Sequence, residues 1–115
     1  VIVAGHHPVY ADTKKPRIER DDMKKAINSI LRKHKVAMYI CGHIHSFQHI
    51  RRKGYDIDYL VNSSASWARD VKQTKGTQYC SDEAGFSIIT VSKKQLSVHF
   101  IDKNGNILHT VNKTK

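Results

Sequence analysis

Four histidines in this sequence stand directly after short apolar runs. The first pair follows Gly5 and the apolar residues 1–4, and the second pair follows Gly42 and the apolar residues 36–40. In an α/β sheet, ligands gather where the chain leaves the carboxyl ends of the strands. Neutral imidazole is a common ligand of zinc, iron and manganese. The pattern predicts a metal site at two strand ends, formed by His6, His43 and His45.

The spacing of His43 and His45 limits how they can act. Residues two positions apart on a regular strand point to the same face, but a turn after Gly42 changes these directions. From such a turn the two imidazoles can serve two neighbouring metal ions. The alternative is a polar loop with two incidental histidines. His7 and His49 are expected to lie beside the ligands or in loops, and His34, His99 and His109 are expected to be ordinary surface or strand residues.

Imidazoles alone do not complete a two-metal hydrolytic site, because such a site needs anionic oxygen ligands, one of them bridging. No aspartate here has a recognisable ligand spacing. We expect those carboxylates to come from residues upstream of this chain. The aspartates considered are Asp12, Asp56, Asp58 and Asp70. Cys41 and Cys80 are neither a metal pair nor a disulfide framework, and Cys41 is expected to be buried.

The composition indicates one folded domain over residues 1–115, with 39% hydrophobic and 26% charged residues. No apolar run approaches the roughly 20 residues of a membrane span, and no signal-peptide pattern surrounds the start. The net charge of +10 fits either a solvated, lysine-rich surface or a surface that steers anionic substrates toward the protein. It is spread along the chain without interleaved aromatic residues, which disfavours nucleic-acid binding. The abrupt start within an apolar run predicts a piece of a larger protein.

The first half of the chain reads as a βαβ unit. Residues 1–4 predict a strand covered on both faces, residues 9–20 a loop, and residues 36–40 a second, parallel strand. Between them a helix is expected to begin near Asp21 and Asp22, whose carboxylates suit a helix N-terminus. Its apolar face is expected to contain Met23, Ala26, Ile27, Ile30 and Leu31.

The second half of the chain favours antiparallel strands. Residues 55–61 alternate as a half-buried strand does, whereas residues 67–83 have no clear period and are expected to be a long excursion. Three further strands are predicted at 86–91, 96–101 and 107–111, joined by turns at 92–95 and 103–106, the second containing an Asn-Gly pair. The fold class is therefore α/β: a βαβ unit followed by antiparallel strands.

Two sequence blocks resemble the metallophosphoesterase superfamily. Val3-Ala4-Gly5-His6 resembles its Val-x-x-His block, and Gly42-His43-Ile44-His45 resembles its Gly-His-x-His block. The Pro-Val-Tyr at residues 8–10, the cysteine before the second block and the Gly-Phe at 85–86 are similar to purple acid phosphatases of the small, tartrate-resistant type. The likeness runs from residue 1 to about residue 111. Over this length the chain resembles the C-terminal half of the calcineurin-like α/β/β/α sandwich.

The resemblance implies an acid phosphatase with a dinuclear metal centre that hydrolyses phosphate monoesters. His6 and His43 would bind the divalent metal (iron, zinc or manganese), and His45 would bind the ferric ion. The family motifs that supply the remaining ligands have no counterpart here, so the fragment alone is expected to be inactive. The resemblance also suggests a secreted, vacuolar or lysosome-like location, and no protein partner is indicated.

One departure from the family concerns the proton for the leaving group. Relatives carry a further histidine a few residues after the first block, but residues 11–16 contain none. His7 replaces a tyrosine of the relatives and could assist catalysis. Two other readings stay open: a phosphodiesterase of the same superfamily, and a scaffold that keeps the fold without catalysis.

Overall fold

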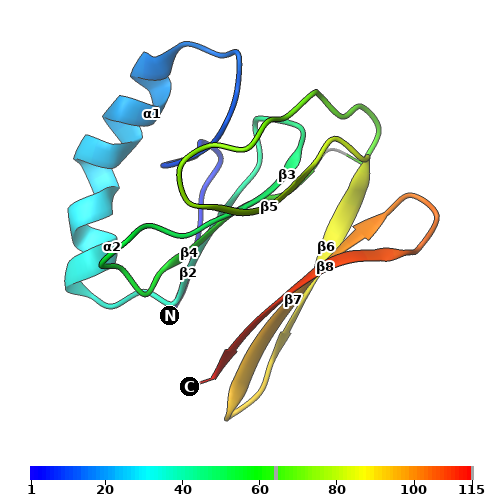
Figure 1. Ribbon diagram of the computed structural model, residues 1–115. Coiled ribbons are helices and arrows are strands. Elements are labelled where there is room, and N and C mark those ends of the chain that lie inside the picture. Colours follow the sequence, from blue (N-terminus) through cyan, green and yellow to red (C-terminus); the bar gives the residue numbers. More distant parts are fainter. Residues whose placement is uncertain (64, 115) are drawn as a thin grey trace.

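The computed structural model describes residues 1–63 and 65–114. A five-stranded mixed sheet lies between a helical layer and a three-stranded antiparallel sheet (Figure 1). Two apolar clusters form the cores on its two faces. The large sheet has the order β1-β2-β4-β3-β5 and the small sheet the order β6-β7-β8. This arrangement confirms the α/β class.

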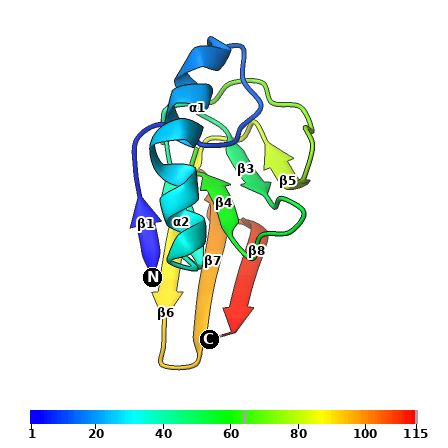
Figure 2. The same cartoon turned by 90° about the vertical axis from the view of Figure 1, so that its left-hand side faces the viewer.

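The predicted βαβ unit is confirmed. β1 (Ile2–Ala4) pairs in parallel with β2 (Met38–Cys41), and the helical segment between them covers the sheet (Figure 2). β1 was expected to be covered on both faces, but it forms the edge of the five-stranded sheet and is only partly buried. Its continuous apolar run therefore does not reflect a central strand here.

The helical segment begins earlier than predicted. α1 (Arg17–Met23) follows Pro16, a π-helical turn spans Lys24–Asn28, and α2 (Ser29–Lys33) completes it. Pro16 is the N-cap residue, with φ −52° and ψ 136°, so the helical backbone begins at Arg17. Asp21 is therefore inside the helix, where its carboxylate pairs with Arg17 at 3.2 Å.

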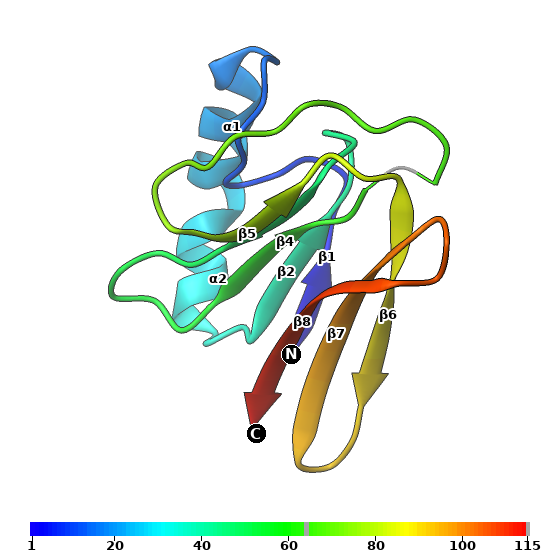
Figure 3. The same ribbon diagram turned by 45° about the vertical axis from the view of Figure 1, so that its right-hand side comes forward.

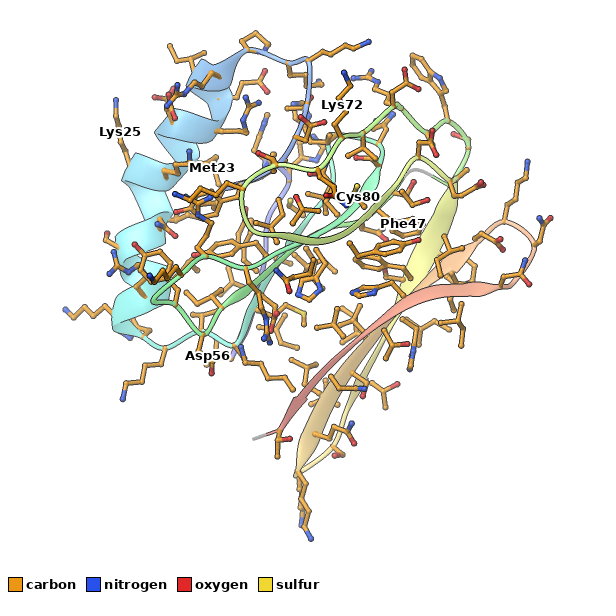
Figure 4. All side chains as sticks on the ribbon, viewed as in Figure 1. Met23, Lys25, Phe47, Asp56, Lys72 and Cys80 are labelled. Carbon is orange, nitrogen blue, oxygen red and sulfur yellow. The ribbon has the colours of Figure 1, made fainter. Side chains whose placement is uncertain are left out.

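The helix contacts the sheet along one narrow row. Met23, Ile27 and Leu31 pack against the core, whereas Ala26 and Ile30, which were also expected there, are exposed. Figure 4 shows Met23 directed toward the sheet and Lys25 directed away from it. Successive residues at i, i+4 and i+8 lie along one side of a helix, which explains why only this row is buried.

Two strands escaped prediction. β3 (Phe47–Ile50) is wholly buried, and β5 (Thr77–Ser81) lies within the segment expected to be an excursion. β4 (Asp58–Val61) is shorter than the strand expected at 55–61, and all of its residues are buried rather than half of them. Its burial follows from its central place, because β2 and β3 flank it and the two cores cover its faces.

The predicted antiparallel meander is confirmed as β6 (Gly85–Val91), β7 (Gln95–Asp102) and β8 (Ile107–Thr114). Gly105 has φ 86° in the second turn, where the Asp102 carboxylate accepts hydrogen bonds from the backbone N–H groups of Asn104 and Asn106. Phe100 stacks on Phe47, with ring centroids 4.7 Å apart, and this contact joins the two sheets.

A buried polar cluster also joins the sheets. The Asp58 carboxylate, fully buried on β4, accepts hydrogen bonds from His49 at 2.7 Å, Arg51 at 2.6 Å and Lys113 at 3.2 Å. On its other side His49 lies 3.0 Å from His109, which stacks on the ring of Tyr79. His109 lies in a strand, β8, as expected, whereas His49, expected beside the ligands or in a loop, lies in β3. Together the two residues bridge the layers.

The N-terminus and the end of β8 lie at the same end of the molecule, opposite the loops that follow β1 and β2 (Figure 3). Among residues 1–63 and 65–114, we find no helix with the length and apolar character needed to cross a membrane.

Candidate metal centre

Three histidines gather where β1 and β2 end. His6, His7 and His43 each offer a ring nitrogen, and these atoms all lie within 4.8 Å of one another. His6 Nε2 is 3.1 Å from His43 Nδ1. Two nitrogen ligands of one ion, each about 2.0–2.1 Å from it, stand roughly 2.8–3.4 Å apart as the angle between them widens from octahedral to tetrahedral. The facing nitrogens of His6 and His43 fit that separation.

The parallel pairing of β1 and β2 brings these residues together. Beyond the strands, the Gly5 N–H donates to the Ile40 carbonyl at 3.0 Å, and the Gly42 N–H donates to the His6 carbonyl at 3.2 Å. The two loops therefore leave the sheet side by side. The expectation that both histidine blocks meet at one edge of the sheet agrees with this arrangement.

The Tyr39 side chain holds the loop that follows β1 in place. Its hydroxyl donates to the His7 carbonyl at 2.8 Å, and burial raises the pKa of Tyr39 to about 12, so the hydroxyl stays a proton donor. The same hydroxyl occupies the space that a side chain on Gly5 would need. A glycine is thus required at position 5 for contact rather than for an unusual backbone angle.

Glu19 is a member of the site that the sequence did not reveal. Its carboxylate lies 3.0 Å from His43 Nε2 and 4.0 Å from His7 Nδ1. Because a carboxylate only accepts, His43 Nε2 carries the proton and its Nδ1 is left to face His6. Metal-bound histidines commonly donate their second N–H to a carboxylate in this way. The available signal was an acidic residue just after Pro16, in a first helical turn.

The electrostatics keep His43 in its neutral form. Burial and the charges of Lys15 and His7 lower the pKa of His43, although the hydrogen bond to Glu19 opposes this shift. The same hydrogen bond lowers the pKa of Glu19. A neutral imidazole beside an ionised carboxylate is the state that binds a metal ion without first losing a proton.

His43 and His45 both have left-handed backbone angles, with φ of 68° and 63°. Such angles are uncommon outside glycine and often mark functional loops. They separate the two side chains: His43 joins His6 and His7, whereas His45 lies outside that group, with its ring centroid 6.0 Å from that of Trp67.

Two buried nitrogens of the site lack a hydrogen-bond partner among residues 1–63 and 65–114. They are Nδ1 of His7 and Nδ1 of His45. An unpaired buried polar atom costs about 1–3 kcal/mol, and a bound metal ion would remove that cost. This set of imidazoles, two of them with an unpaired nitrogen, therefore fits a site for zinc, iron or manganese.

The other candidate residues lie elsewhere in the part of the chain that is described. Asp58 belongs to the buried polar cluster, Asp56 is exposed, and Asp12 binds Gln48 and Lys72 through its backbone and side chain. Cys41 is buried, and burial raises its thiol pKa to about 12, so it is not a ready ligand. His34 is exposed, and His99 bonds to Thr110.

Several known proteins resemble this chain over nearly its whole length. No protein-family model matches the chain. Purple acid phosphatase 4 and purple acid phosphatase 3 of Arabidopsis thaliana are 30% and 31% identical over 94% and 98% of the chain. The human tartrate-resistant acid phosphatase type 5 is 23% identical over 94% of the chain. The chain spans about a third of the length of these relatives, covering 32%, 32% and 35% of them respectively.

Two solved structures share the fold. GAP50, described as the anchor in the inner membrane complex of Plasmodium, matches 98% of this chain and 36% of its own with a TM-score of 0.84 at 21% identity. A predicted phosphoesterase from Streptococcus pneumoniae matches 83% of this chain and 49% of its own with a TM-score of 0.54 at 12% identity. The predicted phosphoesterase-type fold is confirmed.

Proposed function

Since this chain resembles purple acid phosphatases over nearly its whole length, we propose that it is the histidine-bearing part of a metal-dependent phosphatase. The proposed reaction is hydrolysis of phosphate monoesters at a dinuclear centre. One observation carries the proposal: histidines from two separate blocks meet at adjacent ends of parallel strands, with facing nitrogens 3.1 Å apart.

In this proposal His6 and His43 hold the divalent metal (iron, zinc or manganese) and His45 holds a ferric ion. The position of His45 outside the group of three supports a role at a second ion, and its unpaired Nδ1 supports a role as a ligand. Such a centre supplies an activated water and neutralises charge on the phosphoryl oxygens.

The other residues of the chain would hold this arrangement in place. Glu19 orients His43 by accepting its Nε2–H, and Tyr39 fixes the backbone that carries His7. His7, whose Nδ1 has no hydrogen-bond partner, is placed to ligate the ion or to pass a proton beside it. The positive charge of the chain would speed the approach of an anionic ester.

We further propose that residues 1–115 form the C-terminal portion of a calcineurin-like metallophosphoesterase domain. The edge strands β1 and β6 each have one paired neighbour within the described residues. Large apolar side chains on them are exposed, namely Val1 beside β1 and Phe86, Ile88 and Val91 on β6. Such surfaces suit further strands of the same domain. The isolated chain is then expected to show no turnover.

A scaffold without catalysis is the second candidate. The observation that favours it is the fold shared with GAP50, which is described as an anchor. A phosphodiesterase of the same superfamily is a further alternative. Activity toward monoesters, activity toward diesters, and metal content separate the three.

The test is hydrolysis of p-nitrophenyl phosphate across acid pH by the full-length protein, supplied with iron, zinc or manganese. His43→Asn is the informative variant, because asparagine tolerates the left-handed backbone at this position. We expect it to lose about 100-fold or more of the activity. His34→Asn, at an exposed position, is the matched control and should retain activity. A parent protein that binds metal yet cleaves only diesters would favour the diesterase, and one that binds no metal would favour the scaffold.

A further inference from the structure

A hollow of about 420 Å³ opens next to the histidines. It is lined by residues 13–15, Ile44 and residues 67–70. Ile44 stands between His43 and His45 in the chain, so the hollow borders the loop that carries these two histidines. Lys15 also lies near the candidate metal centre, since its charge acts on both His43 and Glu19. A hollow of this size falls within the range of small-molecule sites.

The two walls of the hollow are held in place. Gln48, almost fully buried, accepts a hydrogen bond from the Asp12 N–H at 2.7 Å and donates one to the Asp12 carbonyl at 2.9 Å. The Asp12 carboxylate in turn accepts from the Lys72 N–H at 2.7 Å. The Arg69 N–H donates to the His45 carbonyl at 2.7 Å. The two segments that line the hollow, 13–15 and 67–70, are therefore held together through Asp12 and Lys72, and the second is bonded to the loop that carries His45.

The lining combines a flat aromatic surface with positive charge. Trp67 is 63% exposed, although tryptophan is a large apolar residue. The Arg69 guanidinium lies 5.0 Å from its ring centroid. Lys14, Lys15 and Arg69 outnumber the one carboxylate, that of Asp70. A planar ligand with negative charge matches these features, because aromatic rings stack on tryptophan and anions are drawn to the cations.

We propose that this hollow binds the leaving group of the substrate and selects phosphate monoesters that carry a planar aromatic ring, with Trp67 as the stacking surface. The inference rests on the proposed phosphatase function, because it takes the phosphoryl group to lie at the histidines. Lys15, which lines the hollow and whose charge acts on His43, would position the phosphate end of the substrate. Trp67 and Lys15 thereby become specificity and positioning residues.

The test compares guanosine 5′-monophosphate with ribose 5-phosphate in the full-length protein. The two esters have the same leaving-group oxygen, so a difference between them reports the base alone. We expect Trp67→Leu to lower kcat/KM for guanosine 5′-monophosphate about tenfold through KM, while ribose 5-phosphate changes less than about twofold. Trp67→Phe, which keeps a ring, should recover most of the loss.

A binding measurement separates this proposal from the proposed function. Guanosine 5′-monophosphate should quench tryptophan fluorescence in the parent protein and not in Trp67→Phe. If the parent hydrolyses neither of these esters and also leaves p-nitrophenyl phosphate uncleaved, the phosphatase function fails, and quenching that depends on Trp67 would still support the hollow as a site for planar anions. An equal loss of kcat/KM for both esters in Trp67→Leu, or the absence of such quenching, would overturn the proposal.

Discussion

The buried carboxylate of Asp58 should be the most sensitive single charge for stability. Arg51 and Lys113 both donate to it, and Lys113 is nearly buried. In Asp58→Asn these two cations lose their buried counter-charge. Breaking a buried ion pair by removing one partner costs about 3–5 kcal/mol. Arg51 is half-exposed and regains hydration, so we expect the lower end, about 3 kcal/mol, out of a total of roughly 5–15 kcal/mol.

The same carboxylate makes the free energy of unfolding depend on pH in the acidic range. Burial alone would raise the pKa of Asp58, but hydrogen bonds from His49 and Arg51 and the charge of Lys113 outweigh it and lower the pKa. An aspartate in the unfolded chain has a pKa of about 3.9. The stabilisation from Asp58 is therefore fully present above about pH 4 and is lost as the pH falls below that value. The free-energy gap between parent and Asp58→Asn should narrow over the same range.

Urea unfolding followed by circular dichroism at neutral pH and near pH 3 measures both effects. Asp56→Asn is the matched control, because Asp56 also pairs with Lys113, at 3.1 Å, yet its side chain is 89% exposed. We expect the control to change the free energy of unfolding by less than about 1 kcal/mol. Equal losses in the two variants, or a gap that does not narrow in acid, would refute the account of a paired buried charge.

Two further variants test the site and the core. Gly5→Ala should weaken zinc binding at least about tenfold in a zinc titration, because the new methyl group would collide with the Tyr39 hydroxyl. Gly42→Ala is the control, because a methyl group there meets open space and zinc should bind normally. Equal zinc affinities of the two variants would contradict the contact between Gly5 and Tyr39. Phe100→Ala should lower the free energy of unfolding in urea by about 3–5 kcal/mol, because the Phe100 ring is fully buried. Phe86→Ala should lower it far less, because Phe86 is half-exposed. Similar losses in the two variants would contradict the assigned core.

Local patterns in the sequence were sufficient for several elements. The alternating strands of the meander and the Asn-Gly turn depend on neighbouring residues, and both appear where expected. β3 escaped prediction because Gln48 and His49 are polar but buried, and their partners, Asp12 and Asp58, are distant or on other strands. A local hydrophobic period cannot show that a buried polar side chain finds its hydrogen-bond partner far away in the chain. The acidic pair at 21–22 predicts a helix start at that point, but the helix begins four residues earlier, directly after Pro16.

The candidate site was predictable only in part. The approach of His6 to His43 follows from parallel pairing of the strands that precede them. The separation of His45 from this group depends on two left-handed backbone angles that no residue type in the loop requires. Glu19 reaches His43 because the helix begins at Arg17, so an error of four residues in the helix start concealed a member of the site.

The open edges of β1 and β6 have a consequence for the colloidal behaviour of the chain. Each edge presents unpaired backbone groups beside apolar side chains, which is a template for strand addition between molecules. The net charge of +10 opposes such contacts by mutual repulsion. Salt shortens the range of that repulsion to about 10 Å at 0.1 M. A preparation of these 115 residues alone should therefore stay dispersed longest in dilute buffer and self-associate through β-sheet as ionic strength rises.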